Sequence, residues 1–477
     1  MKRFTTTFLL CSMLLSMAAC GDEAKETTTS ETTVDHTEET EILPEWSLPE
    51  KNWDGETIVF LLRHTEDDWS ADDVLAGEIN GTPVNDAVYQ RNVTIEERYN
   101  VKIDGYNAPI GHSVYAPVIA SVQAGDNSFD VITSYRYDAV KFMQENAVLN
   151  LNDVEYMHLE QSWWNPYYSE ATSVGGKLYY ALGDISRVYK LGVRCLFFNK
   201  DLAGDLGLPN LYNMVTEGVW TLDEMFSMAE QGSLDLDGDG AMKDSDRYGI
   251  QAQTSLGIVL AIGGGVQITS KDENDLPILS VENERYIDCI AKITEWLSEQ
   301  ENKSLYYSDV WLKTQERFSS NQALFQAEVM LLIEALRNSD VNIGILPMPK
   351  YDEAQADYIS YLDSWCQNVY SIPVTSERIP IIGFVLEAMA QESVNTLTPA
   401  FYDVCLTGKY VRDEESAGML DIIFAHTRIE DSECYGWGMY GALADAIKTG
   451  KNATSAIEAR KNAEETGIAK MLSTITE

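Results

Sequence analysis

The residues best suited to chemistry in this sequence lie in an acidic, glycine-containing run at residues 235–246, DLDGDGAMKDSD. Asp235, Asp237, Asp239 and Asp246 place carboxylates at positions 1, 3, 5 and 12 of a calcium-binding loop, and Ala241 offers its main-chain carbonyl at position 7. A hard cation requires several oxygen ligands on one tight loop, which this spacing supplies. The pattern predicts a Ca²⁺ ion held as a structural clip, with no catalytic or sensing role.

Two departures from the usual calcium loop leave an alternative open. Asp246 stands where a bidentate Glu is usual, and Lys243 at position 9 cannot ligate a cation. A turn rich in Asp and Gly that binds no metal would have the same composition. We therefore expect a weak site, as in many extracellular modules.

Aromatic residues in polar, turn-like surroundings form a second group. The chain has 25 Tyr and 10 Trp, and sugar rings stack on such side chains while Asp, Asn and Arg bond their hydroxyls. For each Trp the alternative is core packing, and for Arg136 and Asp184 it is a loop ion pair or a cap. The predicted ligand contacts are Trp69, Tyr135, Arg136, Asp184, Trp365, Tyr435 and Trp437.

Motifs of known enzyme classes are missing from the sequence. It contains no phosphate loop, no HExxH and no GxSxG, and its five histidines are scattered without metal-ligand spacing. We therefore expect a protein that is not an enzyme. Glycoside hydrolysis by two carboxylates stays an alternative, because their separation is a property of the folded chain.

The charge excludes several classes of partner. A formal net charge of −42 disfavours nucleic acid and anionic ligands, so neutral or cationic ligands fit better.

The cysteines beyond residue 20 are single, widely spaced and odd in number, which is unlike a disulfide framework or a zinc site. We expect them to pack as apolar residues: Cys195, Cys289, Cys366, Cys405 and Cys434.

The N-terminus has the features of an export signal. Lys2 and Arg3 precede an apolar run that is too short for a permanent membrane span, so residues 1–19 are predicted to be a signal peptide. The run ends in SMAAC, which resembles the bacterial lipobox and implies lipidation of Cys20; an ordinary cleaved signal is the alternative. Residues 20–52, rich in Thr and Glu, predict a lipid-anchored, disordered linker on the outer face of the cell membrane.

Strand-like and helix-like segments alternate from residue 53 onwards. Strands are predicted at Glu56–Leu62, Val101–Tyr106 and Phe129–Thr133, and helices at Asn85–Tyr99, Val114–Ala124 and Ala139–Asn146. This βαβ order is typical of a parallel sheet. Tyr135 and Arg136 lie in the loop expected after the third strand, where ligands of open α/β sheets bind.

The segment Gly175–Leu202 is predicted to cross between two parts of the fold beside a ligand. Two strand-like runs, Leu178–Leu182 and Leu191–Phe198, flank the polar turn at Gly183–Ser186, and a helix should follow Asn199. Cys195 is expected to pack in the core as an apolar residue.

Later helices are predicted at Trp220–Glu230 with a Thr221/Glu224 capping box, Tyr286–Glu299, Phe318–Leu336, Ile379–Gln391, Leu397–Thr407 and Tyr440–Ile475, and later strands at Val341–Leu346 and Val369–Pro373.

Several stretches together resemble the extracellular solute-binding proteins of ABC importers, in the carbohydrate-binding class. They are GTPVNDAVYQRN followed by IEERYNVKI, then FDVITS, FFNKDL, WTLDEMFSMAE, PMPKYD and SWCQNVYSIP. The resemblance implies an α/β, two-lobe periplasmic-binding-protein-like fold with a hinge between the lobes. Lobe one would comprise residues 53–191 and 371–407, and lobe two residues 192–369 and 408–477. The resemblance to maltodextrin-type binders also favours Trp437, and the resemblance of the first stretch to proteins of anaerobic Gram-positive bacteria implies a Gram-positive-like host.

These observations predict a membrane-anchored receptor that captures a carbohydrate, as an oligosaccharide, between two lobes and delivers it to an ABC permease. The expected partners are the carbohydrate, the permease subunits and the membrane, and the expected state is a monomer. The alternatives are a surface glycan-active enzyme, either a glycosidase or a lyase, and a lectin that retains glycan without import.

Overall fold

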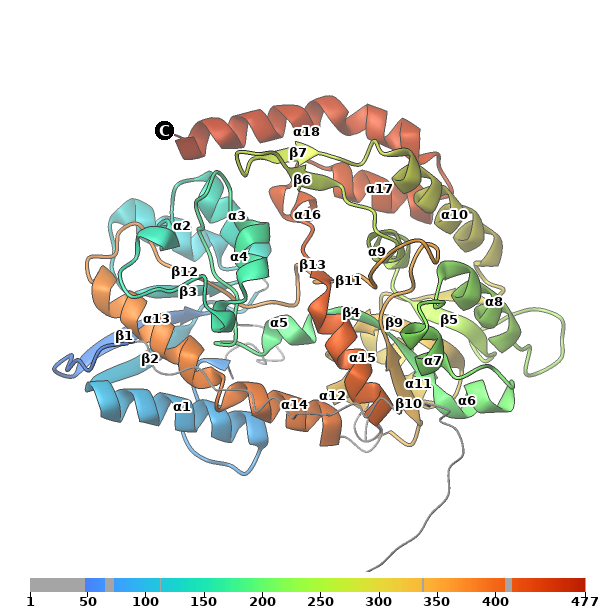
Figure 1. The fold of residues 1–477 in the computed structure, drawn as a ribbon, viewed down its shortest axis with the longest axis horizontal. Helices are drawn as coiled ribbons and strands as arrows, with labels where there is room; N and C mark the ends of the chain where they lie inside the picture. Colours follow the sequence, from blue (N-terminus) through green and yellow to red (C-terminus); the bar gives the residue numbers. More distant parts are fainter. Residues whose placement is uncertain (1–47, 65–72, 112, 337–338, 408–413, 477) are drawn as a thin grey trace, which may run out of the picture. The chain divides into compact units, whose positions relative to one another are not determined.

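Two β-sheets, each at the centre of an α/β lobe, organise the chain (Figure 1). The computed structural model describes residues 48–64, 73–111, 113–336, 339–407 and 414–476, all within one compact unit, Leu43–Glu477. Lobe one has the strand order β12-β3-β1-β2, and lobe two has the order β10-β4-β9-β5-β8. Among the described helices, none has the length and apolar character to cross a bilayer.

Lobe one holds most of the first third of the chain and a later return. Its elements are β1 (Glu56–Leu62), α1 (Pro83–Tyr99), β2 (Val101–Asn107), α2 (Tyr115–Ala124), β3 (Val131–Ser134), α3 (Arg136–Gln144), α4 (Pro166–Thr172), β12 (Val369–Ser371), α13 (Ile379–Ser393) and α14 (Leu397–Thr407).

The second sheet and its helices come largely from the middle of the chain. The elements are α5 (Val188–Leu191) at the crossing, β4 (Arg194–Asn199), α6 (Lys200–Asp205), α7 (Leu211–Thr216), α8 (Leu222–Gly232), β5 (Tyr248–Ala252), α9 (Leu256–Gly263), β6 (Thr269–Lys271), β7 (Pro277–Leu279), α10 (Glu284–Gln300), β8 (Leu305–Tyr307), α11 (Trp311–Ser319), β9 (Ala323–Val329), α12 (Leu332–Leu336), β10 (Ile343–Leu346), β11 (Ser360–Tyr361), α15 (Glu414–Ala425), β13 (Thr427–Arg428), α16 (Ser432–Tyr435), α17 (Met439–Lys448) and α18 (Ala453–Thr476).

Alternating side chains of β1 explain why both faces of the first sheet are covered. Ile58, Phe60 and Leu62 pack in one core with residues of α1 and α13, while Leu61 packs in another core with α2 and α3. β1 pairs in parallel with β2 and with β3, and β12 joins β3 in the antiparallel direction. The predicted βαβ arrangement is confirmed, with the first strand at the expected residues.

The helix predicted at Phe318–Leu336 is wrong. The chain there forms the end of α11, the seven-residue strand β9, and the short helix α12. Ala, Leu, Gln and Glu in this stretch favour a helix in isolation. Every residue of β9 is buried between β4 and β5, and this burial in the middle of the sheet overrides the local preference.

The crossing segment also differs in part from its prediction. Residues 178–182 form no strand and make only an isolated bridge, from Ala181 to Tyr370, and α5 replaces the start of the second predicted run. The rest of that run is β4, with Cys195 fully buried as expected. Asn199 caps α6 by accepting a hydrogen bond from the Leu202 amide.

Three smaller predictions have mixed outcomes. The loop expected at Ser134–Asp138 is shorter, because α3 begins at Arg136. Thr221 precedes α8 without a side-chain cap bond, so the capping box does not form. The C-terminal helices α17 and α18 are separated around Gly450, as predicted.

The two crossing segments lie against each other. Val193 forms a bridge with Leu362, and the Asp363 amide donates to the Gly192 carbonyl at 3.0 Å. A Cβ atom on Gly192 would stand 2.1 Å from the Cys366 carbonyl oxygen, so only glycine permits this approach.

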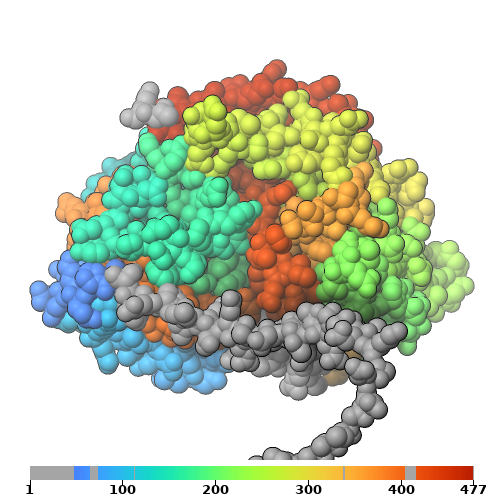
Figure 2. Space-filling view, viewed as in Figure 1, coloured from blue at the N-terminus to red at the C-terminus, as the bar shows by residue number. Residues whose placement is uncertain are grey.

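A second set of contacts joins the lobes away from these crossings. The Lys177 ammonium donates to the Ile475 carbonyl of α18 at 2.7 Å, and the Gly175 amide donates to the Asp275 carbonyl in the β6–β7 hairpin at 2.9 Å. Figure 2 shows a hollow between blue-green residues of lobe one and the yellow residues that include this hairpin, with red residues behind it.

Candidate functional site

The polar residues of the candidate site stand where strands of both sheets end. Arg63 follows β1, Tyr135 follows β3, and Gln253 follows β5. β4 is antiparallel to β9, so Arg194 at its start lies at the same edge as Glu328 near the end of β9. In open α/β sheets such edges are where ligands bind.

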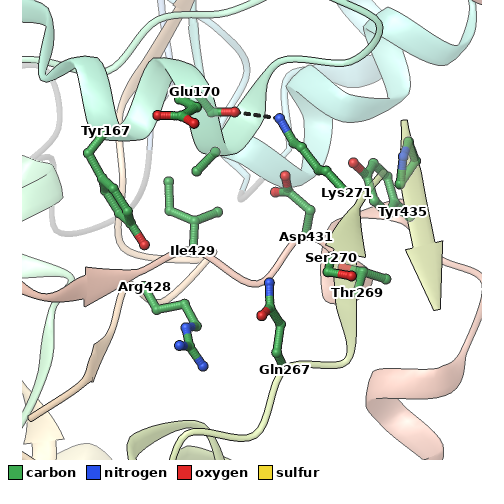
Figure 3. A pocket seen from close by; sticks show the side chains of 12 residues that line it. Tyr167, Glu170, Gln267, Thr269, Ser270, Lys271, Arg428, Ile429, Asp431 and Tyr435 are labelled. Carbon is green, nitrogen blue, oxygen red and sulfur yellow. Dashed lines mark hydrogen bonds between the residues drawn. The ribbon is translucent and has the colours of Figure 1, made fainter. Parts of the chain in front are cut away.

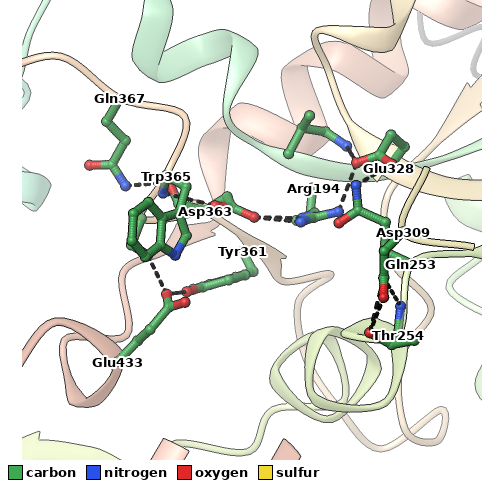
Figure 4. Close-up of polar contacts among 12 residues, drawn as sticks. Arg194, Gln253, Thr254, Asp309, Glu328, Tyr361, Asp363, Trp365, Gln367 and Glu433 are labelled. Carbon is green, nitrogen blue, oxygen red and sulfur yellow. Dashed lines mark hydrogen bonds and ion pairs between the residues drawn. The ribbon is translucent and has the colours of Figure 1, made fainter. Parts of the chain in front are cut away.

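At the edge of lobe two a row of polar side chains is held by hydrogen bonds (Figure 4). Arg194 donates to Glu328 Oε1 at 2.8 Å, and Gln253 donates to Glu328 Oε2 at 3.1 Å. Next along the row, the Thr254 amide and hydroxyl both donate to Asp309 Oδ1 at 2.9 Å. The row therefore presents amide and carboxylate groups in fixed positions.

Arg194 connects this row to the second crossing segment. Its Nε donates to Asp363 Oδ2 at 2.9 Å, and its Nη2 lies 2.5 Å from the same oxygen. Burial alone opposes the charged guanidinium, but Asp363 and Glu328 more than offset this and raise the pKa of Arg194. The second Asp363 oxygen accepts the Trp365 amide at 2.9 Å, so the ion pair sets the turn that carries Trp365.

Trp365 is the most open aromatic residue of this region. Its side chain is stacked on Tyr137 with ring centroids 5.2 Å apart and meets Tyr135 edge-on at 5.7 Å, yet the residue remains 45% exposed. The Arg63 guanidinium lies 3.6 Å from the Tyr135 ring centroid and donates to Asn368 Oδ1 at 2.9 Å. These neighbours support one part of the indole and leave the rest available for a ligand.

Glu433 of α16 adds a carboxylate beside the aromatic cluster. Its Oε2 accepts the hydroxyls of Tyr361 and Ser364. Burial, together with repulsion from Asp363, raises the pKa of Glu433. Around Trp365 the site holds more carboxyl groups than guanidinium groups, which suits a neutral or cationic ligand better than an anionic one.

The structure brings together only two of the predicted ligand contacts, Tyr135 and Trp365. Trp69 lies outside the described residues. Tyr435 and Trp437 form a separate stacked pair at 4.4 Å, and Tyr435 lines another cavity, shown in Figure 3. Trp437 packs on Gly467 of α18, where an added Cβ would stand 2.3 Å from the ring.

Arg136 and Asp184 make ion pairs. Arg136 is fully buried, with its Nε 3.3 Å from both Asp431 Oδ1 and Cys434 Sγ. Asp184 accepts the Lys190 ammonium at 2.8 Å and the Tyr189 hydroxyl at 3.2 Å. Nearby Ser186 is buried and donates to Asp73.

Two other tryptophans in polar sequence surroundings belong to the core. Trp163 and Trp164 are both buried, and their indole N–H groups donate to the two oxygens of Glu387 at 3.0 and 2.6 Å. A buried carboxylate from α13 thus satisfies both rings, and neither faces the site.

In the acidic loop the three first carboxylates converge. Asp235, Asp237 and Asp239 offer oxygens that all lie within 4.8 Å of one another. The Lys243 ammonium stands 3.3 Å from Asp237 Oδ2 and also contacts Asp239. Asp246 is buried, and its two oxygens accept the amides of Leu236 and Lys243 at 2.9 and 2.7 Å.

Sequence reasoning missed the row of lobe two. Glu328 lies in a strand that the sequence suggested was a helix, and no local motif marks its partners. A usable signal was the position of polar residues directly after β-branched, strand-like runs, as in Gln253-Thr254 after YGIQA. The other missed residues are Arg63, Tyr137, Arg194, Asp309, Asp363 and Glu433.

Comparison with solved structures places this geometry in a known fold. The chain resembles the ABC substrate-binding protein Lmo0181 of Listeria monocytogenes, solved with cycloalternan (TM-score 0.55, 11% identity, covering 88% of this chain and 99% of that one). It also resembles the GacH receptor of Streptomyces glaucescens, solved with acarbose (TM-score 0.55, 15% identity, covering 87% of this chain and 98% of that one). A third similar structure is a cyclo/maltodextrin-binding protein complexed with maltotetraose (TM-score 0.56, 12% identity, covering 88% of this chain and 97% of that one). No protein-family model and no curated protein matches the sequence.

These similarities establish the fold. The chain has the two-lobe α/β architecture of ABC-transporter solute-binding proteins, over most of its length. These three proteins are described as a substrate-binding protein, a receptor and a cyclo/maltodextrin-binding protein.

The Arg194–Asp363 pair provides a test of this site's construction. We expect Asp363→Asn to lower the free energy of unfolding by about 2 kcal/mol, because a neutral amide replaces the charge-assisted hydrogen bonds from the buried Arg194, whose charge Glu328 still compensates. The exposed pair of Arg285 and Asp352, 2.8 Å apart, is the matched control, and Asp352→Asn should cost less than about 1 kcal/mol. Urea unfolding measures both variants, and equal losses would contradict the expectation.

Proposed function

We propose that this protein is a solute-binding receptor that captures a carbohydrate between its lobes at the Trp365 surface and passes it to an ABC permease. The observation that carries the proposal is a half-exposed indole, supported by Tyr135 and Tyr137, that adjoins a fixed row of polar groups. A sugar ring requires this combination of an aromatic surface and oriented hydrogen-bonding groups.

Two further observations support a neutral oligosaccharide as the ligand. The proteins of the same fold were solved with cycloalternan, acarbose and maltotetraose. The acidic charge of the chain and of the site disfavours anionic sugars. Closure of the lobes around the ligand would present a changed surface to the permease.

Catalysis is not part of the proposal. Asp363 and Glu328 both bind Arg194, which reduces their suitability as a general acid or base. A glycosidase or lyase would release product from a labelled oligosaccharide, whereas a receptor would bind it at a stoichiometry near one without turnover. A surface lectin would bind without compaction of the lobes, which small-angle scattering measures.

Trp365→Ala tests the binding surface. We expect this variant to bind its oligosaccharide about tenfold to a hundredfold more weakly, because a stacked aromatic contact at the centre of a site contributes on the order of 1.5–3 kcal/mol. The matched control is Tyr106→Ala on β2, since Tyr106 is also 43% exposed but its hydroxyl pairs with Ser128 and its ring is not among the ring contacts of Trp365. Calorimetry against a glycan panel measures both, and an unchanged affinity in Trp365→Ala would refute the assignment.

We also propose that the loop at residues 235–246 binds Ca²⁺ weakly as a structural clip. Asp235, Asp237 and Asp239 would supply carboxylates, together with the Ala241 carbonyl. The ion would displace the Lys243 ammonium, and Asp246 would have to exchange its amide bonds for the metal.

Thermal unfolding with calcium or a chelator tests this clip. At tenfold excess over its dissociation constant, calcium should stabilise the protein by about 1.4 kcal/mol, and Asp235→Asn should abolish the shift. Asp272→Asn is the control, because Asp272 accepts two amides in a similar exposed turn outside the loop. Absence of any calcium-dependent shift in the unaltered protein would exclude the site.

The membrane anchor rests on the sequence around Cys20. We propose that Cys20 is lipidated after removal of residues 1–19 and that the following linker holds a monomeric receptor at the outer face of the cell membrane. Cys20→Ser should move the protein from the membrane to the soluble fraction of cells. Retention of this variant in the membrane would contradict lipidation at this residue.

A further inference from the structure

A separate cavity of about 370 Å³ is lined by residues of both lobes, and Trp365 is not among its lining residues. Asp431 and Tyr435 line it, whereas Glu433 between them bonds Tyr361 and Ser364 beside Trp365. Figure 3 shows Tyr167 and Glu170 of α4 on one side of the space and Gln267 of lobe two on the other, with Ile429 and Asp431 between them, while the Lys271 ammonium reaches the Glu170 carbonyl. Its volume is near the lower end of ligand pockets, which span roughly 300–1,000 Å³.

Several hydrogen-bonding groups of this cavity are unused. Within the described part of the chain, the Tyr167 hydroxyl, the Gln267 amide and the Ser270 hydroxyl make no hydrogen bond with protein groups. Asp431 is only 7% exposed, yet its Oδ1 accepts no hydrogen bond and has only the ionic contact with Arg136. Buried polar atoms normally have partners, so Asp431, together with the more exposed polar groups beside it, is suited to a polar ligand.

The charged residues that line the cavity are two of each sign, Lys271 and Arg428 with Glu170 and Asp431. Lys271 donates to Asp275 at 2.7 Å and to Ser173 at 3.0 Å, and Arg428 donates to the Gly265 and Val266 carbonyls. Asp431 faces Arg136. A ligand with a net charge would disturb these pairs, so a neutral ligand fits best.

The remaining surface of the cavity favours a ring. Tyr167 is 52% exposed and borders the space, which gives an apolar ring face a surface to stack on. We propose that this cavity is a second binding site, for a neutral, single-ring polyhydroxylated molecule such as a monosaccharide or a cyclitol.

The geometry also links this second site to the Trp365 surface. Tyr135 and Tyr137 contact Trp365, while Arg136 between them contacts Asp431 and Cys434. Glu433 and Asp431 face the two sites from one short segment. A ligand that bonds Asp431 therefore acts on the residues that position the aromatic cluster, and each ligand changes the affinity of the other by the same factor.

Binding to the full chain in mild detergent tests the second site. The probes are D-glucose, D-galactose, D-mannose and myo-inositol, measured by saturation-transfer NMR and calorimetry on Trp365→Ala, which weakens binding at the first surface. We expect at least one probe to bind this variant, and a further Tyr167→Ala or Gln267→Leu change to weaken that binding at least tenfold. Tyr106→Ala in the same background is the control and should leave it unchanged.

Three outcomes would overturn the proposal. The first is that no probe binds Trp365→Ala. The second is that probe binding to Trp365→Ala is unchanged when Tyr167→Ala or Gln267→Leu is added. The third is that adding Tyr106→Ala weakens probe binding as much as those two changes do. None of them concerns capture of an oligosaccharide by the unaltered protein, so failure here is distinct from failure of the proposed receptor function. Thermal unfolding of each variant confirms that it folds.

The link between the sites has its own measurement. The oligosaccharide affinity of the unaltered protein is determined with and without a saturating amount of the bound probe. We expect a change of at least fivefold, which typical coupling energies produce. Equal affinities would show that the second site is not coupled to the first.

Discussion

The pairing of Arg194 with Asp363 and Glu328 is the interaction on which the candidate site depends (Figure 4). Arg194 begins β4, Glu328 ends the neighbouring strand β9, and Asp363 belongs to the second crossing segment. One buried guanidinium therefore joins the edge of a sheet to the chain that returns to lobe one. Because a buried charge is stable only with its partners in place, the position of Trp365 is coupled to the register of the sheet.

The same pairing gives the site its chemical character. Two carboxylates are occupied by Arg194, while Gln253, Thr254 and Asp309 continue the row and Trp365 borders it. The result is a surface of oriented dipoles next to an aromatic ring, with little free positive charge. Such a surface distinguishes ligands by the arrangement of their hydroxyls and the apolar face of their rings, as expected for carbohydrate recognition.

The contacts behind α16 place a second polar space between the lobes. The β6–β7 hairpin and α18 reach lobe one through Asp275 and Ile475, so the lobes touch at places other than the crossings. A change in the angle between the lobes must alter these contacts and the space beside them. The residues from Tyr135 to Tyr137 take part on both sides, which makes the two spaces mechanically dependent on each other.

Local sequence determined the regular elements whose own pattern agrees with their burial. Signals that act over a few residues predicted the strand β1, the helices α1 and α14, and the break between α17 and α18. The signals were strand-like alternation, helical spacing of apolar residues and a glycine, respectively. The sequence also singled out Tyr135 and Trp365 as aromatic residues in polar surroundings. Tertiary structure alone decided that Ala323–Val329 is a strand, that Trp163 and Trp164 donate to Glu387, and that Arg194 meets Asp363 and Glu328. Those outcomes depend on partners at least 75 residues away, and burial among them outweighs the local preference of the chain.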